Sequence, residues 1–389
     1  MIPYGRHHLE EDDIQAVADV LRHGDLTQGP KIAEFERAIA QYVGARFAVA
    51  VSSGTAALHL ACLVAELGPG DVVASTPNTF VASTNCACYV GATPRFVDID
   101  PETLNLDPFA LARLAETESL SAIIPVHFAG LPCDMPAIHA VARRSGAFVI
   151  EDASHALGAR HEDGTRVGSC RWSDVTVFSL HPVKILATGE GGLLTTNDEA
   201  LYRRLLRLRS HGIAKNPEDF VAAGGLDAEG RPNPWHYEMQ ELGFNYRMTD
   251  LQAALGLTQL AKIDRFLARR RQVRARYDEA FADLRFLRTT QKGGVDRSAH
   301  HLAVVRIDFA GLGMPRAKFM QELASHGIHT QVHYIPVYRQ PYYARFDVRP
   351  AAFPEMERYF SEALTLPIYY GLAAEDQELV IARVLDLCR

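Results

Sequence analysis

The stretch FAVAVSSGTAALHLA, residues 47–61, decides the fold. It begins with five apolar residues, passes through the small residues SSGTA and continues as a longer apolar segment. A short apolar run that passes through a Ser-Gly turn into a helical segment is typical of a strand followed by a helix in an α/β protein. We therefore predict a buried strand that starts at Phe47 and a helix from Thr55 to Leu67.

The same alternation repeats as far as residue 153. Short apolar runs lie at 71–76 (DVVAST), 95–100 (RFVDID), 122–127 (AIIPVH) and 148–153 (FVIEDA), and helical patterns lie between them at 81–90, 108–115 and 136–145. Strands that alternate with helices are joined by crossovers, which makes most strand pairs parallel and buries the sheet on both faces. Two further strands are expected at 175–180 and 192–196. The sequence thus predicts an α/β fold with a large domain built on a mostly parallel sheet.

The length of the chain allows a second unit. Two amphipathic helices, at 10–21 and 31–43, are expected to form an N-terminal arm before the first strand. An exposed loop rich in Gly, Pro, Asp and Glu is expected at 217–234, and one or two long helices at 249–281. A smaller α+β segment follows, with a strand at 301–308, a helix at 316–326 and an extended segment at 331–335. We place the arm and the large domain in residues 1–248, and the long helix with the smaller domain in residues 249–389.

Composition and charge narrow the class of function. The 389 residues are 48% hydrophobic and 22% charged, and 40 Lys and Arg against 47 Asp and Glu give a net charge of −7. This composition is typical of a soluble globular enzyme, and the net charge gives no general attraction to nucleic acid or to an anionic membrane. The basic run RFLARRRQVRAR at 265–276 is interpreted as a solvated, salt-bridged helix face.

The expected cellular compartment is inferred from sequence features that are absent. The N-terminus shows no charged-then-apolar signal pattern, and no apolar run of about 18 residues occurs. The six cysteines form neither CxxC pairs nor a dense framework, which favours reduced thiols. We expect a cytoplasmic enzyme.

Three predicted strand ends carry polar or reactive residues, and ligands of open parallel sheets bind beyond such ends. The first is Ser52-Ser53-Gly54-Thr55-Ala56, which leads into a helix. The N–H groups and the positive dipole end of that helix suit a phosphate, although an N-cap in a tight turn accounts for the same residues.

The other two strand ends carry a carboxylate and a lysine. Asp152 is followed by His155, and a carboxylate there suits a helix cap, a metal ligand or the partner of a cationic ring nitrogen; the local sequence leaves these open. Lys184 follows Ser179 in SLHPVKILATGEGG, between an apolar strand and a Gly-rich turn. Burial lowers the pKa of an amine, and a neutral lysine attacks an aldehyde. The P-loop pattern GxxxxGK[ST] is absent, which argues against ATP hydrolysis.

Together, a phosphate-binding turn, a strand-end carboxylate and a strand-end lysine describe a site for pyridoxal 5′-phosphate (PLP). The aldehyde of PLP needs a lysine, and its pyridine nitrogen needs a carboxylate to keep it protonated. Its ring also needs an apolar or aromatic cover, for which Phe80 is the candidate.

The chain resembles the sugar-nucleotide aminotransferases of the StrS/DegT type, which have the aspartate-aminotransferase-like fold (PLP fold type I). The resemblance runs nearly from end to end. It rests on the segments LTQGP, SSGTAALHLA, TFVAS, PRFVDID, EDASHALGA, FSLHPVK, GEGG, LRSHGI, GFNYRMTDLQAALG and HYIPVYRQPYY, which occur in the family's order.

The resemblance implies a role for each matching residue. Lys184 forms the Schiff base with the cofactor and moves the proton, Asp152 pairs with the pyridinium nitrogen, and His155 contacts the ring face or its hydroxyl. The implied phosphate cradle is Gly54, Thr55, Ala56 and Ser179, the implied stacking ring is Phe80, and Asn245 is implied to contact the phosphate of the neighbouring subunit. That last contact implies a homodimer with shared active sites.

Within the family, IPYGR, HPVK, PWHYEMQELGFNYR and TQVHYIPVYRQPYY resemble the members of the pseudaminic acid pathway. Those members move an amino group from glutamate to C4 of a UDP-linked 4-keto-6-deoxy-N-acetylhexose and form UDP-4-amino-4,6-dideoxy-N-acetyl-β-L-altrosamine. The implied substrate contacts are Tyr4, Leu26, Thr27, Gln28, Gly29, Gln331, Val332, His333 and Tyr334, with the partner's Arg247. His7 and the pair Tyr338-Arg339 depart from this subgroup, which leaves the sugar and its carrier, UDP or dTDP, open.

Other functions fit the sequence less well. Sugar dehydratases of the family carry His in place of the lysine, regulators have lost the lysine or carry a DNA-binding domain, and a nicotinamide dehydrogenase needs GxGxxG after its first strand. Metal binding by the pairs His7-His8 and His300-His301 is not favoured, because adjacent histidines point apart in a strand. His181 is interpreted as a structural residue of the lysine loop.

Overall fold

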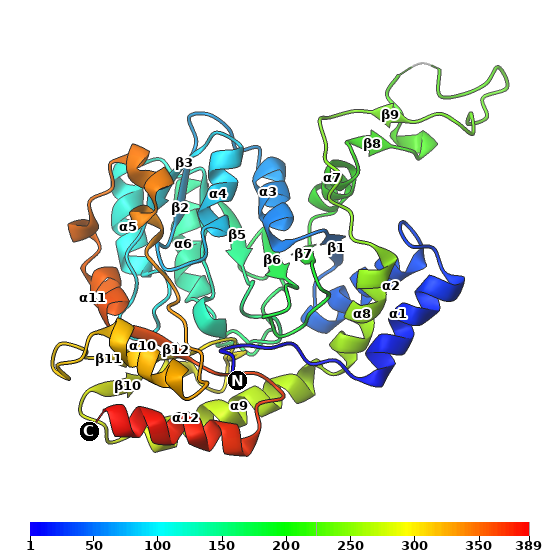
Figure 1. The fold of residues 1–389 in the computed structure, drawn as a ribbon. Helices are drawn as coiled ribbons and strands as arrows, with labels where there is room; N and C mark the ends of the chain where they lie inside the picture. Colours follow the sequence, from blue (N-terminus) through cyan, green and yellow to red (C-terminus); the bar gives the residue numbers. More distant parts are fainter. Residues whose placement is uncertain (223, 389) are drawn as a thin grey trace.

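In the computed structural model, which describes residues 1–222 and 224–388, a seven-stranded sheet forms the large domain (Figure 1). Its strands are β1 (Phe47–Val51), β2 (Val72–Ser75), β3 (Thr93–Phe96), β4 (Ala122–Ile124), β5 (Phe148–Asp152), β6 (Val175–Ser179) and β7 (Gly192–Thr196). They lie in the order β1-β7-β6-β5-β4-β2-β3. β7 is antiparallel to both of its neighbours and the remaining pairs are parallel, so the predicted mostly parallel sheet is confirmed.

Helices cover both faces of this sheet, because successive strand residues point to opposite sides. In β1, Ala48 and Ala50 belong to one core and Val49 and Val51 to the other. One face packs against α3 (Gly54–Val64), α4 (Ala82–Tyr89) and α7 (Glu199–Arg209). The opposite face packs against α2 (Pro30–Val43), α5 (Pro108–Thr117), α6 (Met135–Ser145) and α8 (Asp250–Ala261).

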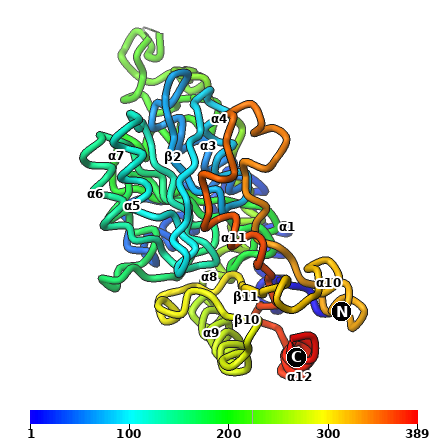
Figure 2. Tube along the Cα trace, turned by 90° about the vertical axis from the view of Figure 1, so that its left-hand side faces the viewer, coloured from blue at the N-terminus to red at the C-terminus, as the bar shows by residue number. Residues whose placement is uncertain are grey.

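A smaller domain lies below the large one in Figure 1, and Figure 2 shows its strands β10 and β11 beside α9. Its antiparallel sheet has the order β10-β11-β12 and packs against α9, α10 and α12. The elements are α9 (Ile263–Ala280), β10 (Leu287–Thr289), β11 (Ala303–Ile307), α10 (Arg316–Ser325), α11 (Pro354–Glu362), β12 (Ala363–Leu366) and α12 (Ala374–Leu387).

The N-terminal segment joins the two domains. α1 (Glu11–His23) packs on α8, whereas the residues before it run to the small domain. There the N–H of Ile2 donates to the carbonyl of Gly327 at 2.7 Å, and Ile2 pairs with Ile328. The chain between Ile2 and α1 therefore crosses the boundary between the domains.

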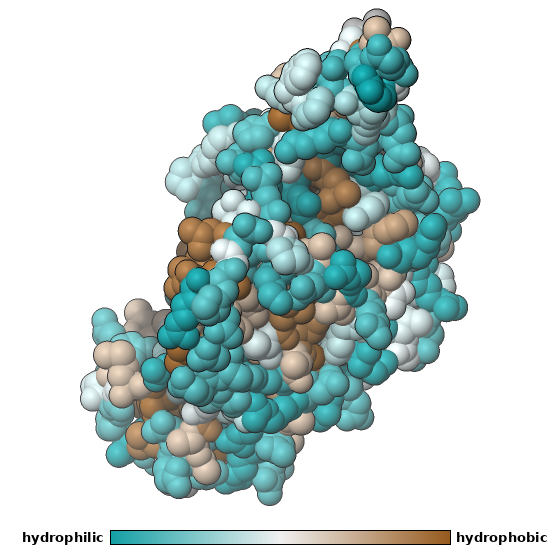
Figure 3. Space-filling view, turned by 90° about the vertical axis from the view of Figure 1, so that its right-hand side faces the viewer, coloured by the Kyte–Doolittle hydropathy of each residue, from teal (hydrophilic) through white to brown (hydrophobic). Residues whose placement is uncertain are grey.

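The predicted loop at 217–234 is confirmed as largely exposed over its described residues. It lies between β8 (Ile213–Ala214) and β9 (Glu238–Met239) and stands out from the body of the molecule (Figure 1). Figure 3 shows this projection at the top of the molecule, with apolar side chains gathered on the face beneath it.

One predicted strand is displaced. β3 starts at Thr93 and ends at Phe96, because the carboxylates that follow accept nearby backbone N–H groups: Asp98 accepts from Ile99 and Asp100 accepts from Thr103. The segment 331–335, which was expected to be extended, lies outside the strands of the sheets, and Gln331 forms an isolated bridge to Thr365 there.

The interpretation of 265–276 as a solvated face is wrong in part. Arg265 and Arg276 do pair with surface carboxylates, but Arg270 and Arg274 are buried. Arg270 donates to three backbone carbonyls and Arg274 donates to the carbonyl of Thr290. A buried guanidinium is tolerated where carbonyl groups accept its hydrogen bonds, and a charge pattern alone does not show them.

Three further sequence expectations concern chain features outside the sheet. All six cysteines are free thiols. No described helix combines the length and the apolar character needed to cross a bilayer. Within residues 1–222 and 224–388, no group of three His, Cys, Asp or Glu side chains is placed to hold a metal ion.

Candidate active site

A cavity of about 630 Å³ lies where the strands of the large sheet end and the small domain begins. Residues that follow β1, β2, β4, β5 and β6 line it, and residues 331–335 with Gln340 form the wall on the side of the small domain. This volume is in the usual range for a small-molecule site. The predicted position of the site, at the carboxyl ends of the strands, is therefore where the chain has a cavity.

The N-terminus of α3 forms one end of the cavity. Ser53 caps the helix by accepting the N–H of Ala56 at 3.1 Å, and Ser53, Gly54 and Thr55 line the cavity. A Cβ on Gly54 would lie 3.0 Å from the Cβ of Ser179, so the space between α3 and β6 exists because residue 54 has no side chain. This end offers helix N–H groups and hydroxyls to an anion.

Ala56, which was expected in this cradle, does not line the cavity. Its N–H is already bonded to the Ser53 hydroxyl, which takes it away from any ligand. Ser53 lines the cavity in its place, a consequence of N-capping that the sequence motif does not show.

Asp152 lies at the end of β5 on the cavity wall and is buried. Its carboxylate accepts the Ser83 hydroxyl at 2.6 Å and the N–H of Ser154 at 3.0 Å. Ser83 in turn lies 2.7 Å from the hydroxyl of Thr79. The backbone of Asp152 is held as well, because its carbonyl accepts the N–H of His127. The carboxylate is thus fixed in direction before any ligand binds.

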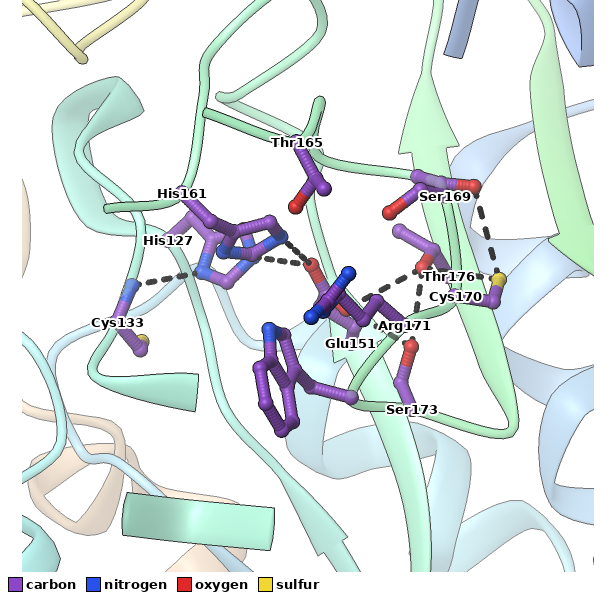
Figure 4. Close-up of polar contacts among 12 residues, drawn as sticks. His127, Cys133, Glu151, His161, Thr165, Ser169, Cys170, Arg171, Ser173 and Thr176 are labelled. Atoms are coloured by element: carbon purple, nitrogen blue, oxygen red, sulfur yellow. Dashed lines mark hydrogen bonds and ion pairs between the residues drawn. The ribbon is translucent and has the colours of Figure 1, made fainter. Parts of the chain in front are cut away.

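A second carboxylate lies behind Asp152, on the opposite face of β5. Figure 4 shows His127 and His161 meeting Glu151 from one side and Ser173 and Thr176 from the other. Burial alone would raise the pKa of Glu151, but the hydrogen bonds from His127 and His161 hold it well below its usual range.

The tautomer of His127 follows from this geometry. Its Nδ1 accepts the N–H of Cys133 at 3.1 Å, so its proton is on Nε2 and is donated to Glu151 at 2.7 Å. This bond ties the residue after β4 to β5 directly behind Asp152. The strand β5, which carries Asp152, is therefore held in place from the face of the sheet opposite to Asp152.

Lys184 lies opposite, on the loop that follows β6. Burial lowers the pKa of its amine to about 8, and the nearby Asp152 carboxylate opposes part of that shift. The loop is held by the bond from the N–H of Lys184 to the carbonyl of His181 at 2.8 Å and by the burial of Ile185 and Leu186. His181 itself is exposed and lines the cavity, and its Nδ1 accepts the N–H of Val183 at 3.4 Å; its structural role stays a prediction.

His155 and two aromatic rings complete the centre of the cavity. His155 is buried, and its Nε2 lies 3.1 Å from the hydroxyl of Tyr334. Burial and the charge of Lys184 hold the pKa of His155 well below its usual value, so the ring is neutral. Phe80 lines the cavity but is 58% exposed, which leaves one face of its ring open to a ligand.

Of the predicted substrate residues, five line the cavity: Tyr4, Gln331, Val332, His333 and Tyr334. The others lie elsewhere in this chain. Gly29 donates its N–H to Asp250, and Thr27 bridges to Thr249, so the segment Leu26, Thr27, Gln28 and Gly29 is on the outer side of α8. Asn245 bridges to Ser210, and Arg247 bridges to Val51. Neither of the last two lines the cavity of its own chain.

Several cavity residues were not among the predicted site residues: Thr79, Ser83, Glu190, His301 and Gln340. Thr79 and Ser83 follow a strand end at a spacing of four residues, so that the start of α4 brings them together, and this spacing was a usable signal. His301 carried no such signal, because the residues that surround it in the structure are distant from it in the sequence.

The residues fit PLP on grounds internal to the structure. The glycine-lined cradle suits its phosphate, the oriented Asp152 carboxylate suits its ring nitrogen, and the amine of Lys184 has the lowered pKa that reaction with an aldehyde needs. In addition, Nδ1 of His155 is buried and has no hydrogen-bond partner within residues 1–222 and 224–388. A buried polar atom with no partner beside a cavity is accounted for by a bound group that supplies one.

Comparison with known proteins likewise identifies the chain as an aminotransferase. Residues 7–385 match the model of the DegT/DnrJ/EryC1/StrS aminotransferase family. The spore coat polysaccharide biosynthesis protein SpsC of Bacillus subtilis is 40% identical over 390 residues, which cover 100% of this chain and 97% of that protein.

Two solved structures have nearly the same fold. Helicobacter pylori PseC, an aminotransferase involved in the biosynthesis of pseudoaminic acid, has a TM-score of 0.90 and 28% identity, with 100% of this chain and 99% of that chain covered. The putative sugar aminotransferase Spr1654 of Streptococcus pneumoniae, solved in its PMP form, has a TM-score of 0.90 and 31% identity with the same coverage. Its PLP form has a TM-score of 0.88. The chain belongs to the DegT/DnrJ/EryC1/StrS aminotransferase family and is a PLP-dependent sugar aminotransferase of fold type I.

Proposed function

We propose that this enzyme moves an amino group from glutamate to C4 of a UDP-linked 4-keto-6-deoxy-N-acetylhexose and forms UDP-4-amino-4,6-dideoxy-N-acetyl-β-L-altrosamine, as a homodimer with shared active sites. The observation that carries the proposal is the single cavity in which the cradle, Asp152 and Lys184 face a polar, aromatic wall from residues 331–334. PseC takes part in the biosynthesis of pseudoaminic acid, and SpsC takes part in the biosynthesis of a spore coat polysaccharide. The similarity to both proteins supports a sugar as the substrate of this enzyme.

Each residue of the large domain has one task in this proposal. When bound, PLP supplies an aldehyde that takes up the amino group and a ring that withdraws electrons from the carbon that loses its proton. Gly54, Thr55 and Ser179 bind the phosphate, and Asp152 keeps the ring nitrogen protonated. Lys184 would hold the aldehyde of the cofactor, and its free amine would carry the proton on Nζ to and from the substrate carbon.

The wall from the small domain suits a sugar. Gln331 is exposed enough to bond hydroxyl or amide groups, and Tyr4 and Tyr334 present both a ring face and a hydroxyl. His333 is held by its Nδ1 contact of 2.8 Å with the hydroxyl of Thr365, and burial lowers its pKa to about 3, so it meets the sugar as a neutral group. Sugar sites combine such ring faces with polar edges.

The charge of the cavity supports a dimer. Among the described residues that line it, Lys184 is the only lysine or arginine, while Asp152 and Glu190 are acidic. The cofactor phosphate, the carboxylates of glutamate and the diphosphate of the sugar nucleotide are all anionic and need cationic partners. In our proposal a second copy supplies a cationic partner, because the partner's Arg247 lies at the substrate together with the partner's segment Leu26–Gly29. The partner's Asn245 adds a neutral amide donor at the cofactor phosphate.

The departures from the pseudaminic acid subgroup lie away from the sugar. Tyr338 donates its hydroxyl to Glu357 at 2.8 Å, and Arg339 forms an ion pair with the same carboxylate on α11. Neither residue lines the cavity, and neither does His7. These substitutions therefore leave the proposed sugar contacts of this chain unchanged.

The proposal is tested by product analysis. The enzyme is incubated with PLP, glutamate and, in parallel, UDP- and dTDP-linked 4-keto-6-deoxy sugars with and without the N-acetyl group, and products are identified by mass and NMR. We expect the highest kcat/KM for the UDP-linked N-acetyl sugar, with the amine at C4. A higher kcat/KM for a dTDP-linked sugar would contradict the proposed substrate and assign the enzyme to another keto sugar of the same reaction class.

A further inference from the structure

His301 is a buried imidazole on the cavity wall to which no role has been given. It precedes β11 in the small domain, is 4% exposed and lines the cavity. Its ring centroid lies 4.4 Å from that of His155, with an angle of 39° between the planes. Two imidazoles from different domains therefore pack against each other at the cofactor end of the site.

The charge state of this pair is set by its surroundings. Burial lowers the pKa of His301 well below its usual value, and the positive charges of Lys184 and Arg270 lower it further. Two neutral rings pack at this distance without repulsion, whereas two cations do not. Nδ1 of each ring has no hydrogen-bond partner among the described residues, while Nε2 of His155 meets the Tyr334 hydroxyl.

The backbone of His301 is held at both its N–H and its carbonyl. The N–H donates to the carbonyl of Ala129 at 2.9 Å, and the carbonyl accepts from the buried guanidinium of Arg270 at 3.3 Å. The same guanidinium binds the carbonyls of His300 and Ile368 at 3.2 and 3.1 Å. The buried side chain of Arg270 on α9 therefore ties the segment before β11 to the small-domain core.

Gly130 fixes the distance between the two histidines. It has a φ of 104°, and a Cβ there would lie 2.9 Å from the N of His300, 3.0 Å from the O of His155 and 3.1 Å from the N of His301. The backbones of the two histidine segments thus meet across a residue that has no side chain. Any larger residue at this point would separate the rings.

We propose that His301 is a positioning residue for the cofactor: its ring packs against His155 and holds that imidazole with Nδ1 directed to the bound PLP, while Arg270 and Gly130 hold His301 in place. His301 acts through His155 and takes no part in proton transfer. The inference rests on the contact between His155 and the cofactor proposed above, and it does not depend on which sugar is aminated.

The test measures PLP binding to the apo-enzyme and the pH midpoint of the absorbance band of the bound cofactor. H301A removes the ring, H301F keeps a ring without nitrogens, and R270M removes the carbonyl bonds but keeps the aliphatic stem. Because His155 loses its support in H301A and R270M, we expect the PLP Kd to rise about tenfold and the pH midpoint to shift. H301F is expected to stay within about twofold of the natural protein.

Two controls separate positioning from general stability. His300 is as buried as His301, but its Nε2 bonds to the carbonyl of Val295 and it does not line the cavity. H300A should therefore lower the Tm without changing the PLP Kd. R269M, which removes a surface bond from Arg269 to the carbonyl of Leu372, should change neither. If H301A fails to fold, H301N is measured in its place under the same criteria.

The measured Kd values and pH midpoints separate a positioning role of His301 from an effect on stability and from an error in the proposed contact between His155 and the cofactor. If H155A weakens PLP binding and H301A and R270M do not, His301 has no positioning role. If H155A itself leaves the Kd and the pH midpoint unchanged, the contact between His155 and the cofactor is wrong, and the inference falls with it. Equal changes in H300A and H301A would show that the effect is one of stability, and a loss in H301F as large as in H301A would contradict positioning by the ring.

Discussion

The amine of Lys184 gives the first prediction, because its pKa near 8 comes from burial and is partly opposed by Asp152. An amine reacts with an aldehyde in its neutral form, which is the minority below pH 8 and the majority above it. The rate at which apo-enzyme captures PLP should therefore rise from pH 6 through a midpoint near pH 8 and level off above about pH 9. Stopped-flow absorbance at fixed PLP concentration measures this.

The variant D152N sharpens this test. Removing the carboxylate removes the charge that raises the pKa of Lys184, so the midpoint of the rate profile should move to lower pH. K184A should show no capture at any pH while it remains folded. A D152N midpoint at higher pH than the natural protein would contradict the electrostatic account.

Ser83 gives a second prediction at the same scale. Its hydroxyl donates to the Asp152 carboxylate at 2.6 Å, and a hydrogen bond to a charged group contributes about 1.5–3 kcal/mol. In S83A, Asp152 loses the group that directs it, and the PLP Kd should rise about tenfold. Equilibrium titration of the apo-enzyme measures the change.

Ser173 is the matched control for Ser83. Its hydroxyl donates to Glu151 at 2.8 Å, so S173A breaks the same kind of bond on the opposite face of β5 (Figure 4). We expect S173A to lower the Tm and to leave the PLP Kd within about twofold. An equal rise of Kd in both variants would mean that β5 as a whole, and not the direction of Asp152, controls binding.

The candidate site was predictable from the sequence only in part. Asp152, His155 and Lys184 were found because each follows a recognisable strand, and ligands of such sheets bind at strand ends. Ser83 and His301 were missed for different reasons. Ser83 acts through Asp152 and has no chemistry of its own in a motif, and His301 reaches the site only because the small domain packs on the large one.

Among the elements, the N-terminus of α3 is the one that the cofactor phosphate needs. A Cβ on Gly54 would lie 3.0 Å from the Cβ of Ser179 and 3.3 Å from its hydroxyl, whereas alanine is favourable in the helix itself. G54A should therefore keep α3 but fill the cradle. We expect the PLP Kd to rise at least about tenfold, with a smaller change for pyridoxal, which lacks the phosphate.

The control for this element is a glycine in open space. A Cβ on Gly293 would meet nothing within 4 Å, so G293A should leave the Kd of both PLP and pyridoxal unchanged. If G54A weakened pyridoxal binding as much as PLP binding, the N-terminus of α3 would not be the phosphate site.

Elements were predicted well where periodicity decides them and poorly where side chains override it. The strands at 47–51, 148–152 and 192–196 each contain an apolar run, FAVAV, FVI and LL, and they lie where they were expected. The run RFVDID looked like a strand, but Asp98 accepts the N–H of Ile99 and Asp100 accepts the N–H of Thr103, and β3 ends early. Local side-chain bonds to backbone compete with strand pairing in this way.

At the scale of the whole molecule, the shortage of positive charge in the cavity leads to a prediction about the dimer. In our proposal the partner's Arg247 completes a site that contains Lys184 of the first chain. K184A and R247A homodimers should each be nearly inactive. When the two are mixed and allowed to exchange subunits, half of the dimers are hybrids, and each hybrid has one site with both residues intact.

The mixture should therefore recover about a quarter of the natural activity, because half of its dimers are hybrids and one of the two sites of each hybrid works. The measurement is the specific activity of an equimolar mixture after refolding, with each homodimer refolded alone as control. If Arg247 served its own chain, no site in any hybrid would be intact and the mixture would stay inactive.

The most direct test of the central claim is the absorbance spectrum of the PLP-loaded enzyme as substrates are added in turn. The account predicts that glutamate removes the band of the lysine-bound cofactor and that a UDP-linked 4-keto-6-deoxy-N-acetylhexose then restores it, because the same Lys184 serves both halves of the exchange. Failure of glutamate to remove the band, or failure of every nucleotide-linked keto sugar to restore it, would contradict the account.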